Sequence, residues 1–337
     1  MNDRAAPHRL EAEWLAHRFD EARGEIRFVP YSRAERAAVP FLIDAHLPAR
    51  EYKALSRDAA RAERGEAPVH FVFHSGFCCS TLLAASLDQP GLASSFSEPT
   101  ILNDAFGWRL RGAASGDLGI LVDDALGLLA RPFAGDAAAV LKPSTVVNGL
   151  AEAMLAIRPQ ARAIVMYAPL RDFLISIAKK GLDGRLWVRD LLVKCRAEGR
   201  TGALGFSDLD LLGQSDLQVA ALDWLMQHAV FAQLISATPQ RVRSLSSETF
   251  MSAPERTLEA AARLFQLPWN DDHLDAALTQ TMRRNSKSGA QFGAADRAAE
   301  YERAYAVHAD EIDKVLVWAG EVARSAGLPV ELAAPLI

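Results

Sequence analysis

Residues 69–88, VHFVFHSGFCCSTLLAASLD, decide the fold class of this chain. The apolar run at 71–73 predicts a buried strand, and the amphipathic stretch that begins at Ser80 and Thr81 predicts a helix. A short loop of small and polar residues separates the two. A strand, a loop and a helix N-terminus in this order favour a bound phosphate, because backbone N–H groups and the helix dipole both attract an anion. The stretch therefore predicts an anion-binding site.

Four further stretches carry the short apolar or β-branched pattern of strands, and helical patterns separate them. Strands that alternate with helices imply a mostly parallel sheet covered on both faces. We therefore expect an α/β protein with a three-layer P-loop NTPase-like fold. Its central sheet should have about five strands, and extra helices are expected at both ends of the chain. The four further strands are expected at Leu92–Phe96, Ala138–Leu141, Ala163–Tyr167 and Arg241–Leu245.

Outside the predicted sheet, the spacing of apolar residues and the positions of prolines and glycines indicate the other segments. Residues 1–66 mix charges, scattered apolar residues and prolines, which predicts a helical or irregular extension packed on a main domain of residues 67–337. Residues 199–215 hold four glycines and predict an exposed connection that could cover a site. Helical spacing of apolar residues predicts helices at 117–131, 145–157, 215–237, 254–267 and from 296 onward.

Composition limits the classes of function. The 337 residues are half hydrophobic, which suffices for one large domain with added helices or for two domains. A formal net charge of −5 without a basic cluster argues against a nucleic-acid partner. Three cysteines, Cys78, Cys79 and Cys195, give neither a disulfide framework nor a metal-ligand spacing. No signal-peptide pattern or membrane-length apolar run is present, so we expect a soluble, cytoplasmic protein without a membrane partner.

Four motifs resemble those of the sulfotransferase family, in particular its bacterial branches: HSGFCCSTLL at 74–83, SEP at 97–99, LKPS at 141–144 and VMYAPLRDFLISIAKKG at 165–181. The resemblance implies transfer of a sulfuryl group from 3′-phosphoadenosine 5′-phosphosulfate to a hydroxyl or amine of a small acceptor, without a metal or a covalent intermediate. It implies that Ser176, four residues after Asp172, holds the 3′-phosphate. It also implies that the first loop and helix start hold the 5′-phosphosulfate, through Ser75, Gly76, Phe77, Cys78, Cys79, Ser80 and Thr81.

The chain departs from the family pattern at two positions. Phe77 stands in the first loop where the family usually has Lys or Arg, and Ala168 stands where the family has the Arg of the 3′-phosphate site. Arg171 is a candidate to reach this phosphate from another direction. Lys287, in the segment RNSKSG at 284–289, resembles the basic loop with which the family closes over the same phosphate.

Three residues at predicted strand ends are candidates for catalysis, because open α/β sheets gather ligands there. Glu98 could accept the acceptor's proton, or it could be an acidic residue in a helix first turn. His74 could act as the base, hydrogen-bond a sulfuryl oxygen, or satisfy a local backbone group. Lys142 could replace the charge that is absent at Phe77, or it could be solvated.

Each loop residue also has a purely structural interpretation. Ser80 and Thr81 are favoured helix caps on any helix. Cys78 and Cys79 have no histidine partner in a recognisable motif, so we expect structural roles for both.

Two other functions remain open. A relative that binds a nucleotide or anion without catalysis would explain the missing loop cation. A P-loop phosphotransferase should show G-x-x-x-x-G-K-[ST] and a magnesium-binding Asp at a strand end, and neither is present in good form.

Overall fold

The computed structural model describes residues 10–281 and 294–337 of the chain. Its strands are β1 (Trp14–Asp20), β2 (Glu25–Pro30), β3 (Lys53–Ser56), β4 (Val69–His74), β5 (Ala93–Ser97), β6 (Ala138–Lys142), β7 (Ala163–Tyr167) and β8 (Val242–Ser246). Its helices are α1 (Arg33–Ala37), α2 (Arg57–Arg61), α3 (Ser80–Leu87), α4 (Thr100–Leu110), α5 (Ser115–Leu129), η1 (Thr145–Leu150), α6 (Ala151–Ile157), α7 (Leu170–Lys179), α8 (Gly181–Ala197), η2 (Arg200–Leu204), α9 (Asp208–Leu212), α10 (Asp216–Ala237), α11 (Ser247–Ser252), α12 (Pro254–Phe265), α13 (Asp271–Ala276), η3 (Ala277–Thr281) and α14 (Ala294–Ser325).

Five parallel strands form the central sheet, in the order β5-β6-β4-β7-β8. Strand β4, the first of these in the sequence, lies in the middle between β6 and β7. The chain therefore leaves β4 toward one edge of the sheet and later crosses to the other, and ligands of open α/β sheets bind outside the strand ends at such a point. The predicted α/β fold with about five parallel strands is confirmed.

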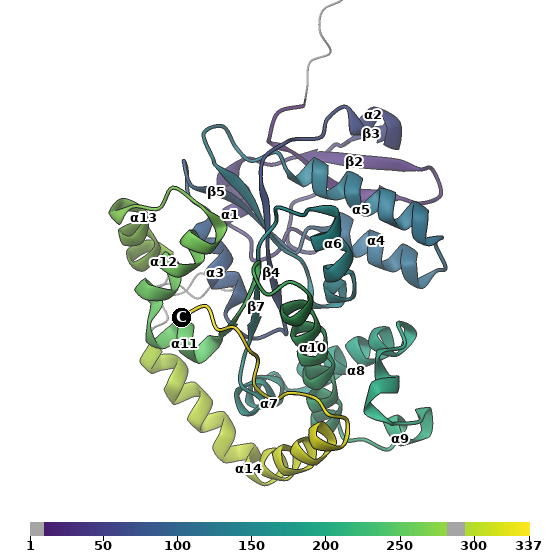
Figure 1. Ribbon diagram of the computed structural model, residues 1–337, viewed down its shortest axis with the longest axis vertical. Helices are drawn as coiled ribbons and strands as arrows, with labels where there is room; N and C mark the ends of the chain where they lie inside the picture. Colours follow the sequence, from purple (N-terminus) through teal and green to yellow (C-terminus); the bar gives the residue numbers. More distant parts are fainter. Residues whose placement is uncertain (1–9, 282–293) are drawn as a thin grey trace, which may run out of the picture.

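Both faces of the sheet are buried, and the residues of β4 alternate between two hydrophobic cores. Val72 joins a core built with α3, α7, α10 and α12. Phe71 and Phe73 join a second core built with α4, α5, α6 and strands β1 and β2. Figure 1 shows α4, α5 and α6 on one side of the sheet and α3 and α12 on the other. The continuous apolar run at 71–73 follows from this arrangement, because a strand covered on both faces needs apolar residues at every position.

The N-terminal region differs from the sequence-based expectation. Strands β1, β2 and β3 form a three-stranded antiparallel sheet, accompanied by the two five-residue helices α1 and α2. The prediction of a helical or irregular extension is wrong for this region. Ile26 and Phe28 are fully buried while Arg27 between them is not, which is the period-2 pattern of a half-buried strand. The pattern covers only a few residues, and the charged residues and prolines around it favoured an irregular segment.

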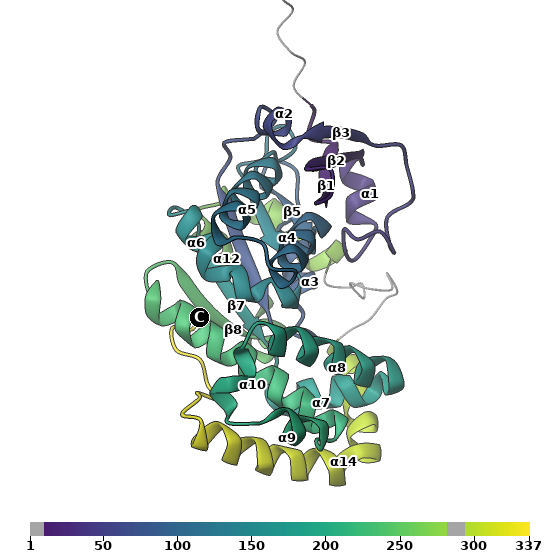
Figure 2. The same cartoon turned by 90° about the vertical axis from the view of Figure 1, so that its right-hand side faces the viewer.

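Helices α7, α8, α10 and α14 form the end of the molecule opposite the N-terminal sheet (Figure 2). Helix α14 packs across α7 and α10. The connection at 199–215 is exposed over most of its length, as expected, but it contains η2 and α9. Their Leu204 and Leu211 are buried in the hydrophobic core, which holds the segment on the helices beneath it. Within the described ranges, no helix has both the length and the apolar character needed to cross a membrane.

Candidate functional site

A cavity of about 890 Å³ lies at the carboxyl ends of β4, β5 and β6. The loop after β4, the start of α3 and the strand-end residues Glu98 and Lys142 form part of its wall. Helices α7 and α8 and the start of the described part of α14 supply another part, and residues 40–46 of the N-terminal region supply a third. Segments far apart in sequence therefore build one chamber, where parallel sheets usually place ligands.

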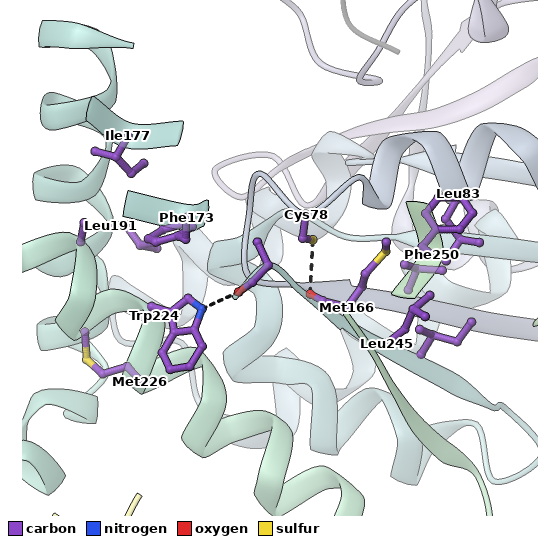
Figure 3. Close-up of a cluster of buried hydrophobic side chains, with 14 of the residues drawn as sticks. Cys78, Leu83, Met166, Phe173, Ile177, Leu191, Trp224, Met226, Leu245 and Phe250 are labelled. Carbon is purple, nitrogen blue, oxygen red and sulfur yellow. Dashed lines mark hydrogen bonds between the residues drawn. The ribbon is translucent and has the colours of Figure 1, made fainter. Parts of the chain in front are cut away.

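The loop after β4 is a tight turn anchored to β7. Gly76, Phe77 and Cys79 all have positive φ, at +87°, +54° and +64°. The backbone N–H of Ser75 donates to the carbonyl oxygen of Met166 at 3.0 Å. The thiol of Cys78 donates to the same oxygen at 3.3 Å (Figure 3). These bonds hold the loop at the sheet edge, and the left-handed residues provide the sharp reversal that leads into α3.

The N-terminus of α3 has the features of an anion site. Its N-cap residue, Cys79, makes no side-chain capping hydrogen bond. The Cys79 side chain therefore does not cap the first-turn N–H groups of α3, and such groups at a helix start favour an anion. Ser80 and Thr81 both line the cavity, as do Gly76, Phe77, Cys78 and Cys79, whereas Ser75 is buried away from it. Most of the predicted loop set is thus brought to one wall.

The two loop cysteines differ in their environment. Cys78 is fully buried, and burial raises the pKa of its thiol, with a smaller contribution from neighbouring Cys79. The Cys78 thiol therefore stays protonated and serves as the hydrogen-bond donor to β7 described above. Lys142, which lines the same cavity, acts in the opposite direction on this pKa.

Glu98 and Lys142 form a buried ion pair at the ends of β5 and β6. The Lys142 Nζ atom lies 2.7 Å from Glu98 Oε1, and the two side chains are 1% and 17% exposed. The Lys142 ammonium also lies 4.9 Å from the centre of the Phe41 ring. The alternative of a solvated Lys142 is therefore excluded, while Glu98 keeps a surface that faces the cavity.

The backbone of Glu98 is strained. Its φ is +51°, a left-handed conformation that costs a non-glycine residue on the order of 1 kcal/mol or more. A hydrogen bond of 2.6 Å from Glu98 N to the Lys142 carbonyl oxygen holds this conformation. The chain thus turns sharply after β5 and brings the Glu98 carboxylate back toward the end of β6. Strain of this kind clusters at functional sites.

His74 lies beside the same carboxylate, with Nε2 at 3.8 Å from Glu98 Oε1. Its other ring nitrogen, Nδ1, accepts a hydrogen bond of 3.1 Å from Gly76 N. In a neutral imidazole this assigns the proton to Nε2. The Nδ1 lone pair is engaged by the loop, so Glu98 is better placed than His74 to accept a proton.

The residues predicted for the 3′-phosphate are only partly brought together. Ser176 is buried, lines the cavity, and its Oγ lies 2.5 Å from the hydroxyl oxygen of Tyr301 on α14. Arg171 stands near the other end of α7 with its guanidinium 4.0 Å from the centre of the Tyr305 ring, and it is not among the lining residues found in the described chain. Lys287 lies outside the described residues.

Sequence reasoning missed three contributions to the cavity. Residues 40–46 reach it from the N-terminal region, Tyr301 reaches it from α14, and Lys180 stands at the corner between α7 and α8. Nothing in the local sequence around 40–46 or Tyr301 signals a site, because each acts on residues more than 50 positions away. Lys180 offered a signal, since it follows Ser176 by one helical turn and therefore shares its face of α7.

In the described part of the chain no group of three or more His, Cys, Asp or Glu side chains that could hold a metal ion is found. No protein-family model matches the sequence, and no curated protein matches it. Among solved structures, the chain is similar to a sulfotransferase domain from the curacin biosynthetic pathway. The two are 14% identical, the match covers 67% of this chain and 81% of that domain, and the TM-score is 0.39.

Proposed function

We propose that this chain is a sulfotransferase-like enzyme that transfers a sulfuryl group from 3′-phosphoadenosine 5′-phosphosulfate to a hydroxyl or amine of a small acceptor. One observation carries the proposal: a single cavity holds both the start of α3, with Ser80 and Thr81, and the strand-end carboxylate of Glu98. The first is suited to bind a phosphosulfate and the second to accept a proton.

In the proposed reaction, the acceptor oxygen or nitrogen forms a bond to sulfur. The bond between sulfur and the bridging phosphate oxygen breaks, and its electron pair stays on the leaving phosphate. The acceptor's proton passes to Glu98, whose carboxylate Lys142 holds in place at 2.7 Å. His74 Nε2–H is a donor for the acceptor or for a sulfuryl oxygen. The start of α3 and the hydroxyls of Ser80 and Thr81 would stabilise the phosphosulfate.

Lys142 has a second proposed role, stabilising the charge that develops on the leaving phosphate. Its place in the same cavity as the loop residues supports this role. Its pairing with Glu98 limits the role, since much of the ammonium charge is balanced by that carboxylate. Removal of Lys142 should therefore impair both proton acceptance by Glu98 and departure of the phosphate.

Calorimetry with adenosine 3′,5′-bisphosphate tests the donor, and radiolabelled sulfuryl transfer to a panel of alcohols, phenols and amines tests turnover. We expect binding by the intact chain and transfer to at least one acceptor. Absence of bisphosphate binding would refute the proposed donor. Full transferase activity in the Lys142→Ala variant would refute the role of Lys142.

A second function, nucleotide or anion binding without catalysis, has one specific observation in its favour. Phe77 stands where the family resemblance places a basic residue, and its ring packs edge-on to Trp187 at 5.2 Å and near Phe173 at 6.1 Å. An apolar cluster thus occupies the place of a cation in the loop. Bisphosphate binding without turnover on the whole acceptor panel would favour this function.

A further inference from the structure

We propose that Lys180 supplies the positive charge that the phosphosulfate loop lacks at Phe77. This inference rests on the proposed function and adds a residue to its donor site. Lys180 lines the cavity from outside the loop, and its ammonium lies 5.7 Å from the centre of the Phe77 ring. The charge is therefore next to the loop residue whose family counterpart is basic.

Lys180 differs from the other lysines of the cavity wall in having no acidic partner among the residues that the structure describes. Lys142 is paired with Glu98 at 2.7 Å, Lys179 with Glu300 at 3.0 Å, and Lys194 with Asp190. In each of these pairs a carboxylate already balances the ammonium. Lys180 instead stands over the face of an aromatic ring and is exposed, so its charge is available to an anion that enters the cavity.

Local structure fixes the backbone position of Lys180. It caps the C-terminus of α7 and directly precedes α8, and the next residue, Gly181, makes the corner with φ +57°. The loop packs on α8: a Cβ atom added to Gly76 would lie 3.0 Å from the Trp187 ring, and Phe77 packs edge-on to the same ring. Lys180, at the start of α8, therefore lies beside the loop although it comes from a different element.

A lysine placed this way suits the leaving 5′-phosphate. Its ammonium is a compact charge on a flexible stem, so it can leave the Phe77 ring and donate hydrogen bonds to a phosphate in the loop. Ser176 lies one turn earlier on the same face of α7, at the proposed 3′-phosphate site. The position of the Phe77 contact assigns Lys180 to the 5′ side rather than to the 3′ side.

Calorimetry at low ionic strength with adenosine 3′,5′-bisphosphate tests the assignment. Lys180→Ala should weaken binding about tenfold or more, as expected for the loss of a hydrogen bond to a charged group. Lys180→Arg, which keeps the charge, should restore most of the affinity. Lys314→Ala is a matched control, because it removes one lysine from an exposed pair on α14 outside the cavity, and it should leave the affinity unchanged. An unaltered urea midpoint of each variant checks the fold.

Two monophosphates then locate the contact. Lys180→Ala should weaken binding of adenosine 5′-monophosphate and leave binding of adenosine 3′-monophosphate unchanged. Equal affinity of the wild type and Lys180→Ala for the bisphosphate would overturn the assignment and leave the proposed function standing. A loss confined to the 3′-monophosphate would also overturn it. Failure of the wild type to bind the bisphosphate would instead refute the proposed function, and the assignment would fall with it.

Discussion

The two ends of the cavity handle charge in opposite ways. At the strand ends, Lys142 is buried and paired with Glu98, and a strained turn holds the carboxylate in place. At the corner of α7 and α8, Lys179 and Lys180 are exposed, and Lys179 pairs with Glu300 of α14. One end is fixed by its own ion pair, and the other presents charge to solvent.

This difference indicates how the two ends would serve a reaction. A buried pair keeps a fixed geometry but provides little net charge, which suits the positioning of a proton acceptor. An exposed lysine is flexible and well solvated, and it is suited to meet an anionic ligand as that ligand enters. Substitutions at each end test whether burial of charge distinguishes the two.

The largest stability effect is expected from Glu98→Ala. This variant leaves the Lys142 ammonium buried without its carboxylate, and we expect the free energy of unfolding to fall by about 3 kcal/mol, near the lower limit for breaking a buried pair. Urea unfolding followed by circular dichroism measures the change.

The double variant Glu98→Ala with Lys142→Met is the matched control for this prediction. It removes both charges and should recover most of the loss, because an apolar side chain replaces the buried ammonium. If Glu98→Ala alone unfolded at the wild-type urea midpoint, Lys142 would not depend on Glu98, and the contrast between the two cavity ends would disappear.

The Glu98–Lys142 pair keeps its charges because the two groups balance each other. A buried titratable side chain without such a partner should remain neutral, and His228 tests this expectation. It is fully buried on α10, its ring stacks on Trp224, and burial lowers its pKa to about 3 from an ordinary value of 6.5. Between these two pH values the unfolded chain binds a proton at His228 that the folded chain does not. Stability should therefore fall as the pH falls below about 6.5, and by pH 5 His228 should cost about 2 kcal/mol.

His228→Phe isolates this contribution. The variant keeps an aromatic ring but cannot bind the proton, so its loss of stability between pH 7 and pH 5 should be about 2 kcal/mol smaller than that of the wild type. The comparison between the two proteins is required, because other groups also titrate in this range. Burial lowers the pKa of His70 to about 4, which acts in the same direction, and raises that of Asp88 to about 6, which acts in the opposite direction. Parallel pH profiles would contradict the prediction.

Much of the parallel sheet could be predicted from the sequence, because its signals are local. The expected strand Ala163–Tyr167 matches β7 residue for residue, and the other expected strands fall within one residue or two of those observed. The N-terminal sheet was missed because its short strands mix apolar residues with charged and polar ones, such as His17, Arg18 and Arg27. Residues 14–56 therefore contain no continuous apolar run of the kind that predicts a buried strand.

The candidate site was predictable only where it follows strand ends. Glu98 and Lys142 could be named because the carboxyl ends of neighbouring strands meet, but their mutual pairing depends on a residue with φ +51° and could not be foreseen. Tyr301 bonds Ser176 across 125 positions, which only tertiary packing can bring together. The place of Lys180 beside the Phe77 loop could not be foreseen from its own helix, because that loop is about a hundred positions away in the sequence.

The smallest effect is expected from Lys179→Ala, at the exposed end of the cavity. This variant removes the pair with Glu300, whose two side chains are 31% and 38% exposed. Because water already screens the pair, the free energy of unfolding should fall by less than about 1 kcal/mol, and the loss should shrink further in high salt. Urea unfolding at low and high salt measures both. A loss as large as that of Glu98→Ala would show that the fold needs both lysines equally, and burial of charge would no longer separate the two ends.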